Sequence, residues 1–134
     1  MSSPRQNSEI QKLISLRKEA NRLCIEFTDL DFRAERGWNS AEAEARLVVV
    51  SSEADSARAA LRTHLRILQS DHAEVLAAYY AFEIEIAERE LAKEPDDRRA
   101  QIRVEKWQKV ASGESDDIIF VQILSENIWF QHSS

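Results

Sequence analysis

The chain has 134 residues, of which 43% are apolar and 31% are charged, so it is long enough for one domain and too apolar for a disordered protein. It contains only two glycines and two prolines, which argues against sheets and sandwiches, because their many turns draw on both residues. With a net charge of −6, the chain lacks the excess of basic residues that is typical of proteins that bind nucleic acids or anionic membranes.

The cysteine content and the hydropathy pattern indicate where the protein works. Cys24 is the only cysteine, which excludes a disulfide within the chain and is typical of a reducing compartment. The first residues are polar and lack the apolar stretch of a secretory signal. No apolar run approaches the roughly 20 residues that span a membrane. We therefore expect a cytoplasmic, intracellular protein without a membrane partner.

A single helical domain is expected over residues 8–131, between a disordered tail at 1–7 and a short tail at 132–134. Within it, two heptad patterns of apolar residues mirror each other about the sequence Gly37-Trp38-Asn39. Counted outward from this turn they match residue for residue, as the seam of an antiparallel helical hairpin requires. The first pattern comprises Leu13, Leu16, Ala20, Leu23, Phe27, Leu30 and Ala34, and the second comprises Ala43, Leu47, Val50, Ala54, Ala57, Leu61 and His64.

The residues of the turn define the ends of both helices. Gly37 stands where the C-terminal cap of a helix belongs, and Asn39 with Glu42 has the spacing of a capping box at the start of the next helix. A connection this short places neighbouring helices antiparallel. We therefore predict a hairpin of residues 8–36 against 40–68.

After the turn, the next glycine or proline is Pro95, which leaves two interpretations of the second helix. A continuous helix of that length would extend about 85 Å at 1.5 Å per residue. Alternatively, the helix breaks at residues 69–72, where Asp71 and Glu74 have the spacing of an N-cap and the third helical residue. We favour the break.

A second hairpin is predicted from residues 72–93 and 96–111. Pro95, in the first turn, and the acidic residues after it mark the start of its second helix, and Gly113 marks the end. The predicted fold is therefore all-α, an antiparallel hairpin extended into a four- to five-helix bundle.

The last predicted element, residues 118–130, is strongly apolar. As a helix it would have one narrow polar stripe, at Gln122 and Glu126, so it must be buried within the bundle or against another chain. Its β-branched and aromatic residues leave a strand as the alternative. The candidate interface residues are Ile119, Phe120, Ile123, Ile128, Trp129 and Phe130, together with Trp38 in the turn of the first hairpin.

The titratable residues show no arrangement typical of a catalytic or metal site. His64 and His72 would lie about 12 Å apart along a helix, too far for one ion. The chain has no Glu-x-x-His pair of the kind found in di-iron bundles, no glycine-rich phosphate loop and no nucleophile elbow. We therefore expect no cofactor, no metal and no enzymatic activity, and the sequence identifies no small-molecule substrate.

The apolar C-terminal segment favours a non-enzymatic helical protein–protein interaction or oligomerisation module, whose partner is a second copy in a dimer. A first alternative is a small acidic inhibitor that binds a basic, nucleic-acid-handling protein through Glu83, Glu85, Glu88 and Glu90. A second alternative is a helical ligand-binding protein or small enzyme with its site between helices. We do not expect nucleic acid as a direct partner.

Overall fold

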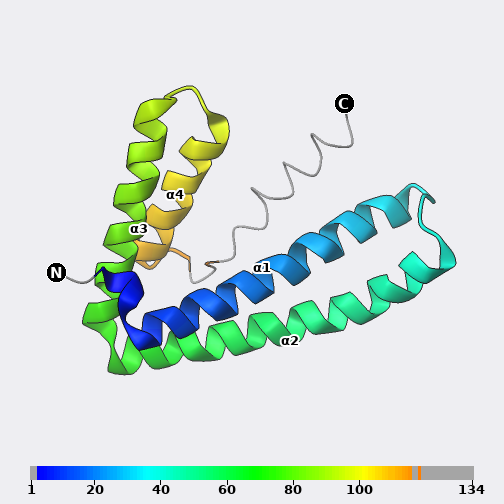
Figure 1. Ribbon diagram of the computed structural model, residues 1–134, viewed down its shortest axis with the longest axis horizontal. Coiled ribbons are helices and arrows are strands. Elements are labelled where there is room, and N and C mark those ends of the chain that lie inside the picture. The colour runs from blue at the N-terminus through cyan, green and yellow to red at the C-terminus, as the bar shows by residue number, and fades with distance from the viewer. Residues whose placement is uncertain (1–2, 116–117, 119–134) are drawn as a thin grey trace.

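The computed structural model describes residues 3–115 and residue 118, and this part of the chain contains four α-helices and no strand (Figure 1). The predicted all-α class is therefore confirmed. The predicted segment 118–130, apart from its first residue, and the tail at 132–134 lie outside the described residues. The helices are α1 (Ser8–Glu35), α2 (Ala41–Asp71), α3 (Ala73–Lys93) and α4 (Arg98–Ser112), and a short 3-10 helix, η1 (Pro4–Gln6), precedes α1.

Residues 3–7, which belong to the tail expected at 1–7, contain the 3-10 helix η1 and two capping residues. Ser3 caps η1 by accepting a hydrogen bond from the backbone N–H of Arg5 at 3.2 Å. Asn7 caps α1, and its side-chain oxygen accepts hydrogen bonds from the backbone N–H groups of Glu9 and Ile10. Because these caps satisfy backbone donors that would otherwise need water, residues 3–7 form a structured extension of α1.

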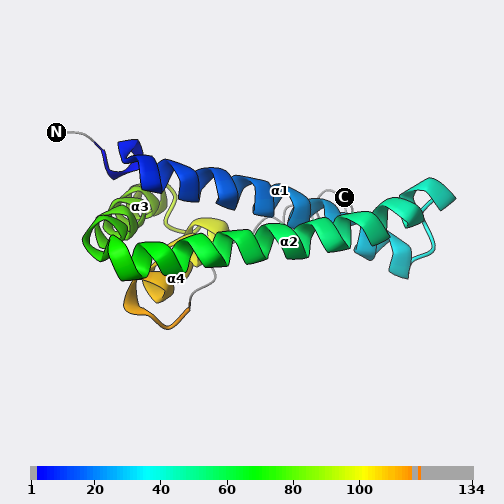
Figure 2. The same ribbon diagram turned by 90° about the horizontal axis from the view of Figure 1, so that it is seen from below.

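Helices α1 and α2 lie side by side and run in opposite directions (Figures 1 and 2). In the turn, Gly37 has a φ of +69°, which glycine adopts without steric cost. Ser40 caps α2 by accepting from the N–H of Ala43 at 3.2 Å. Asn39 instead donates its side-chain amide to the carbonyl oxygen of Leu30 at 2.9 Å. The predicted capping box is therefore wrong by one residue, because Asn39 ties the turn back to α1.

Most of the predicted seam is buried between the two helices. At the end far from the turn, His64 is buried, and its Nε2 atom donates to the carbonyl oxygen of Glu9 at 3.0 Å, whereas its buried Nδ1 atom has no hydrogen-bond partner in the described part of the chain. The pairing of individual residues across the seam stays a prediction. The other buried seam residues are Leu13, Ala20, Leu23, Val50, Ala54 and Leu61, and Leu16, Phe27, Leu30 and Ala57 are partly buried against them.

The predicted break lies at His72, whose φ of −139° and ψ of 40° are not helical. The alternative of one continuous helix is therefore wrong. Asp71 is not the N-cap of α3, because it is the last residue of α2. The N–H group of His72, the next residue, still donates a helical hydrogen bond to the carbonyl oxygen of Leu68 at 2.8 Å. After this break, α3 stands steeply against the first hairpin (Figure 1).

Helix α4 runs back along α3 in Figure 1. Asp97 caps α4 by accepting from the N–H of Arg99 at 3.0 Å, so Pro95 precedes the helix and does not occupy its first turn as predicted. Gly113 ends α4 with a φ of +86°, as predicted.

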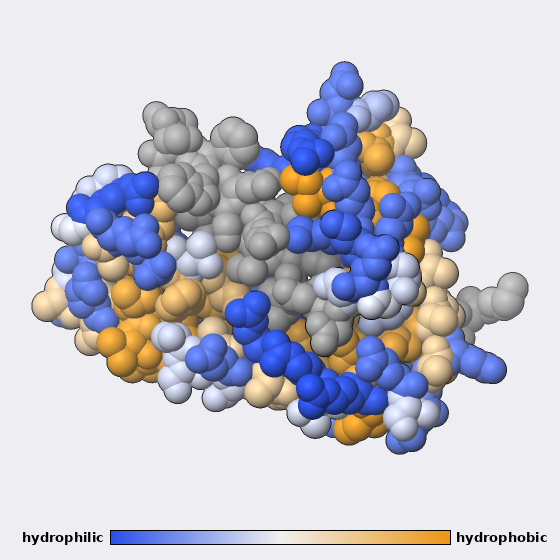
Figure 3. Space-filling model, turned by 180° about the vertical axis from the view of Figure 1, so that it is seen from behind, coloured by the Kyte–Doolittle hydropathy of each residue, from blue (hydrophilic) through white to orange (hydrophobic). Residues whose placement is uncertain are grey.

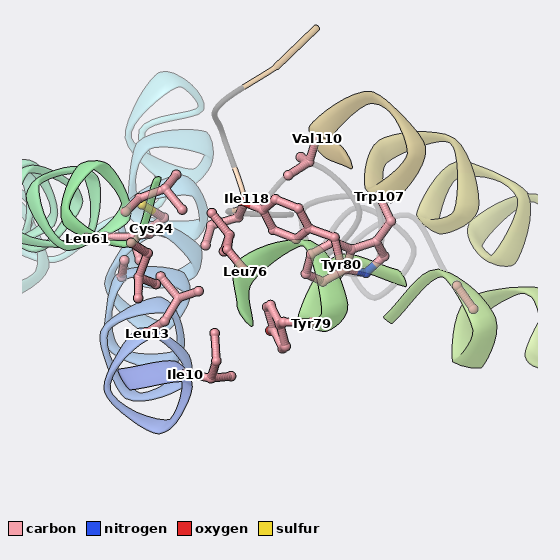
Figure 4. Packing of buried hydrophobic residues seen from close by; sticks show 14 of the residues in the cluster. Ile10, Leu13, Cys24, Leu61, Leu76, Tyr79, Tyr80, Trp107, Val110 and Ile118 are labelled. Atoms are coloured by element: carbon pink, nitrogen blue, oxygen red, sulfur yellow. The ribbon is translucent and has the colours of Figure 1, made fainter. Parts of the chain in front are cut away.

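The two hairpins meet in one hydrophobic core at the end of the molecule far from the Gly37 turn (Figures 1 and 4). Toward the turn, no other helix of the described part covers α1 or α2. Over that length the hairpin buries only its own seam, and its outer faces remain accessible. The largest fully buried side chains are Tyr79, Ile10, Leu13, Leu65, Leu68, Ile118 and Val50.

Candidate interaction surfaces

The predicted C-terminal interface begins inside the core of the monomer. Ile118 is 1% exposed, and Figure 4 shows it among the side chains of both hairpins. Its backbone carbonyl accepts a hydrogen bond from Nε of Arg17 at 2.7 Å, and the Arg17 guanidinium lies 4.9 Å from the centre of the Trp107 ring. The other residues predicted for this interface lie outside the described residues: Ile119, Phe120, Ile123, Ile128, Trp129 and Phe130.

Three aromatic rings join α3 to α4 beside Ile118. The ring centres of Tyr79 and Tyr80 lie 5.8 and 6.1 Å from that of Trp107, and all three side chains are buried. Burial raises the pKa of the Tyr79 hydroxyl, and the nearby Arg17 opposes this shift. The cluster is therefore part of the core and offers no surface to a partner.

Trp38 covers the end of the hairpin and is also accessible. Its ring meets that of Phe32 edge-on, with 6.0 Å between the ring centres. The guanidinium of Arg36 lies 3.6 Å from the Phe32 centre and 5.7 Å from the Trp38 centre. Trp38 nevertheless remains 58% exposed, so it can both shield Phe32 and contact another molecule.

Glu83 does not belong to an exposed acidic face. Its side chain is 8% exposed, and its two carboxylate oxygens accept hydrogen bonds from Nε and Nη2 of Arg5 at 2.6 and 2.8 Å. This pairing raises the pKa of the Arg5 guanidinium above its ordinary value. The guanidinium also lies 5.3 Å from the centre of the Phe82 ring. The pair fastens η1 onto α3, so Glu83 serves the fold.

The three remaining acidic residues of the proposed face, Glu85, Glu88 and Glu90, are exposed on α3. Glu85 pairs with Arg89 and Glu90 with Lys93, each within the same helix. These short-range pairs neutralise part of the acidic charge that the inhibitor hypothesis needs. The face is therefore smaller and less acidic than the sequence indicated.

A different surface, not anticipated from the sequence, lies on the face of α2 that points away from α1. Eight residues with spacings of three and four occupy it, and we call them the outer stripe. All are exposed and none is charged. Val49 is 50% and Ile67 is 44% exposed, and the neighbouring Val48 is 73% exposed. The outer stripe comprises Ala41, Ala45, Val49, Ser52, Ser56, Ala59, Thr63 and Ile67.

An open groove of about 720 Å³ runs along one edge of the outer stripe, between α1 and α2. Apolar residues reach the surface toward the turn end of this hairpin, on the face seen in Figure 3. The groove combines an apolar lining with the two carboxylates of Glu19 and Glu53. Its remaining lining residues are Leu16 and Leu23 from α1 and Val48, Val49, Ser52, Ser56, Ala57 and Ala60 from α2.

Two arginines hold the charges around this groove in place. The guanidinium of Arg46 contacts the carboxylate of Glu26 on α1 at 2.7 Å and that of Glu53 on α2 at 2.9 Å. The hydrogen bonds from Arg46 lower the pKa of Glu26 below its ordinary value. Glu19 pairs with Arg22 at 2.6 Å within α1. Both carboxylates of the groove are thus already paired, and the groove presents mainly its apolar lining.

The described residues place few chemically reactive groups together. No three histidine, cysteine, aspartate or glutamate side chains among them lie close enough to hold a metal ion. Cys24 is a buried thiol in the first hairpin. Within the same residues, every helix is too short or too polar to cross a membrane.

The sequence contains a signal for the outer stripe, since the charged residues of α2 avoid all of its positions. Alanine, serine and threonine on one helix face are, however, equally typical of a surface in contact with water. The structure adds that α3 and α4 leave this face uncovered and that Val49 and Ile67 are exposed on it.

Comparison with protein-family models, with curated proteins and with solved structures gives no match.

Proposed function

We propose that the protein is a non-enzymatic helical module that binds other proteins, including a second copy of itself, through exposed faces of its first hairpin. One observation carries this proposal. Four large apolar side chains are strongly exposed in the described residues, and three of them lie on α2, at or beside the outer stripe: Val48, Val49 and Ile67. Val48 and Val49 are adjacent and extend the apolar lining of the groove, and apolar surface of this kind on a small domain marks interaction sites. The apolar residues 119–130 stay a second predicted contact region, and the buried thiol of Cys24 supports the proposed cytoplasmic location.

The groove between α1 and α2 suits a helical partner. Two antiparallel helices present a furrow in which a third helix packs its apolar side chains, as in three-helix bundles and helix-in-groove complexes. The apolar lining from Leu16, Leu23 and Val49 would contact such a helix. Because the carboxylates at the groove are already paired, an amphipathic helix with its apolar face toward the groove is the partner of matching chemistry.

The test is a capture experiment with the full chain and two matched variants. Ala60 lines the groove and Ala92 is an exposed alanine of α3, so Ala60→Glu places a carboxylate in the groove and Ala92→Glu places one elsewhere. From a lysate of the source cells, we expect wild type and Ala92→Glu to retain the same proteins and Ala60→Glu to lose them. If no retained protein depends on the groove, and the chain sediments as a monomer at all concentrations, the proposal is wrong.

A further inference from the structure

The outer stripe of α2 has a spacing that is its own mirror image. Counted from residue 54 toward either end of the helix, its positions recur at the same distances. Twofold symmetry requires this of a helix that packs antiparallel against a second copy of itself. In that arrangement Ser52 of one copy lies opposite Ser56 of the other, Val49 opposite Ala59, Ala45 opposite Thr63 and Ala41 opposite Ile67.

The residue sizes at these levels are complementary. Each of the two larger apolar residues, Val49 and Ile67, meets an alanine of the second copy, and the central level pairs two serines. Alternation of large and small side chains lets two helices approach closely without leaving voids. The outer stripe therefore fits a copy of itself better than it fits a helix of uniformly large residues.

Three charged residues beside the stripe are complementary in the same register, although Asp55 of each copy meets its own counterpart beside the axis. Glu44 lies on one flank, and Arg62 lies on the same flank about five turns later, with Arg66 one turn beyond it. A twofold axis perpendicular to the helices brings the same flank of both copies together. Glu44 of one copy then lies between Arg62 and Arg66 of the other. Along the helix axis, it is about 3 Å from each arginine. All three are exposed, and none forms an ion pair within the described residues. The contact occurs twice in the dimer, once at each end.

The outer stripe is also accessible to a second copy. Seen from below in Figure 2, α2 runs along the front of the molecule, and no other described helix crosses it. The stripe is about 40 Å long and one helix about 10 Å wide, so the contact covers about 400 Å² on each copy. An interface of this size is typical of weak, reversible complexes, with dissociation constants between about 1 µM and 1 mM.

From these observations we infer that two copies of the chain pair through the outer stripes of α2, antiparallel, about a twofold axis beside residue 54. This inference rests on the proposed interaction function and names its partner: a second copy of this chain. The groove shares Val49, Ser52 and Ser56 with the stripe, so a helix bound in the groove and a second copy on the stripe would compete for these residues.

The first test compares one alanine of the stripe with one distant alanine by sedimentation equilibrium of the full chain. Ala59→Glu places a carboxylate within the pairing surface opposite Val49, and we expect it to weaken the dimer at least about tenfold. Ala92→Glu should leave the dissociation constant unchanged. Circular dichroism and thermal unfolding verify that the variants fold, as expected for exposed positions.

The second test examines the register through its charges. Glu44→Lys alone places an ammonium group opposite two arginines, and Arg62→Glu/Arg66→Glu alone places two carboxylates opposite Glu44. Each variant should dimerise about five- to tenfold more weakly than wild type, because favourable exposed pairs become repulsive at both ends. Mixed together, the two variants restore opposite charges across the interface, so their heterodimer should form more tightly than either variant pairs with itself.

A dimer that persists in Ala59→Glu, or charge-reversed variants that do not recover on mixing, would overturn the α2 pairing. Those results would leave groove-dependent capture of other proteins intact. Conversely, loss of groove-dependent capture with an intact α2 dimer would remove the heterologous partner and keep the self-association. The two outcomes are told apart by their variants, because Ala59 belongs to the stripe and not to the groove, and Ala60 to the groove and not to the stripe.

Discussion

Replacing Arg5 with alanine should destabilise the whole protein, although Arg5 lies in a three-residue 3-10 helix near the N-terminus. Its partner Glu83 is 8% exposed, and both carboxylate oxygens are bound to Arg5. Breaking a fully buried ion pair costs about 3–5 kcal/mol, because it leaves a buried charge without a partner. The Arg5 side chain is 47% exposed, so water already screens the pair. We therefore expect Arg5→Ala to lower the free energy of unfolding by about 2 kcal/mol.

Urea unfolding followed by circular dichroism measures this loss. With a slope of about 2 kcal/mol per molar urea, the unfolding midpoint should fall by about 1 M. Arg22→Ala is the matched control, because Arg22 contacts Glu19 at the same distance of 2.6 Å but both side chains are exposed. Its midpoint should not change measurably. Adding Glu83→Gln to Arg5→Ala should recover part of the loss, since a neutral amide needs no cation. Equal midpoints for Arg5→Ala and wild type would refute the buried-pair reasoning.

Three further predictions concern the seam of the first hairpin, the loss of stability at acidic pH and the pairing of α2 with a second copy. Leu13→Ala should lower the free energy of unfolding in urea by about 2–5 kcal/mol, because Leu13 is fully buried. Phe27→Ala should lower it by less, because Phe27 is only partly buried. A larger loss for Phe27→Ala than for Leu13→Ala would contradict the predicted seam. The lowered pKa of Glu26 contributes stability above its ordinary value near 4.5, and this contribution is lost as the pH falls through the pKa of the folded state. Glu26→Gln should therefore flatten the decrease in unfolding midpoint measured on acidification. Asp55 would meet its own copy beside the twofold axis, so Asp55→Asn should tighten the dimer in sedimentation equilibrium, with Glu88→Gln as an unchanged control.

The sequence was sufficient for the elements that depend on local chemistry. The scarcity of glycine and proline indicated an all-α chain, and Gly37 and Gly113 marked helix ends because a left-handed backbone is cheap only for glycine. The break between α2 and α3 was also predictable, although its exact residue was not. The N-caps of α2 and α3 were each misplaced by one position, since Asn39 bonds back to α1 and Asp71 still belongs to α2.

Spacing along one chain was therefore enough to predict that this protein is helical and where its helices turn, and most of the residues it predicted for the seam of the first hairpin are buried. It could not reveal that Glu83 is buried against Arg5, 78 residues away, or decide whether Ile118 is buried within the bundle or against another chain. Nor could it reveal that the outer stripe of α2 is left uncovered. These outcomes depend on how the two hairpins pack against each other, and side chains distant in sequence become neighbours only through that packing.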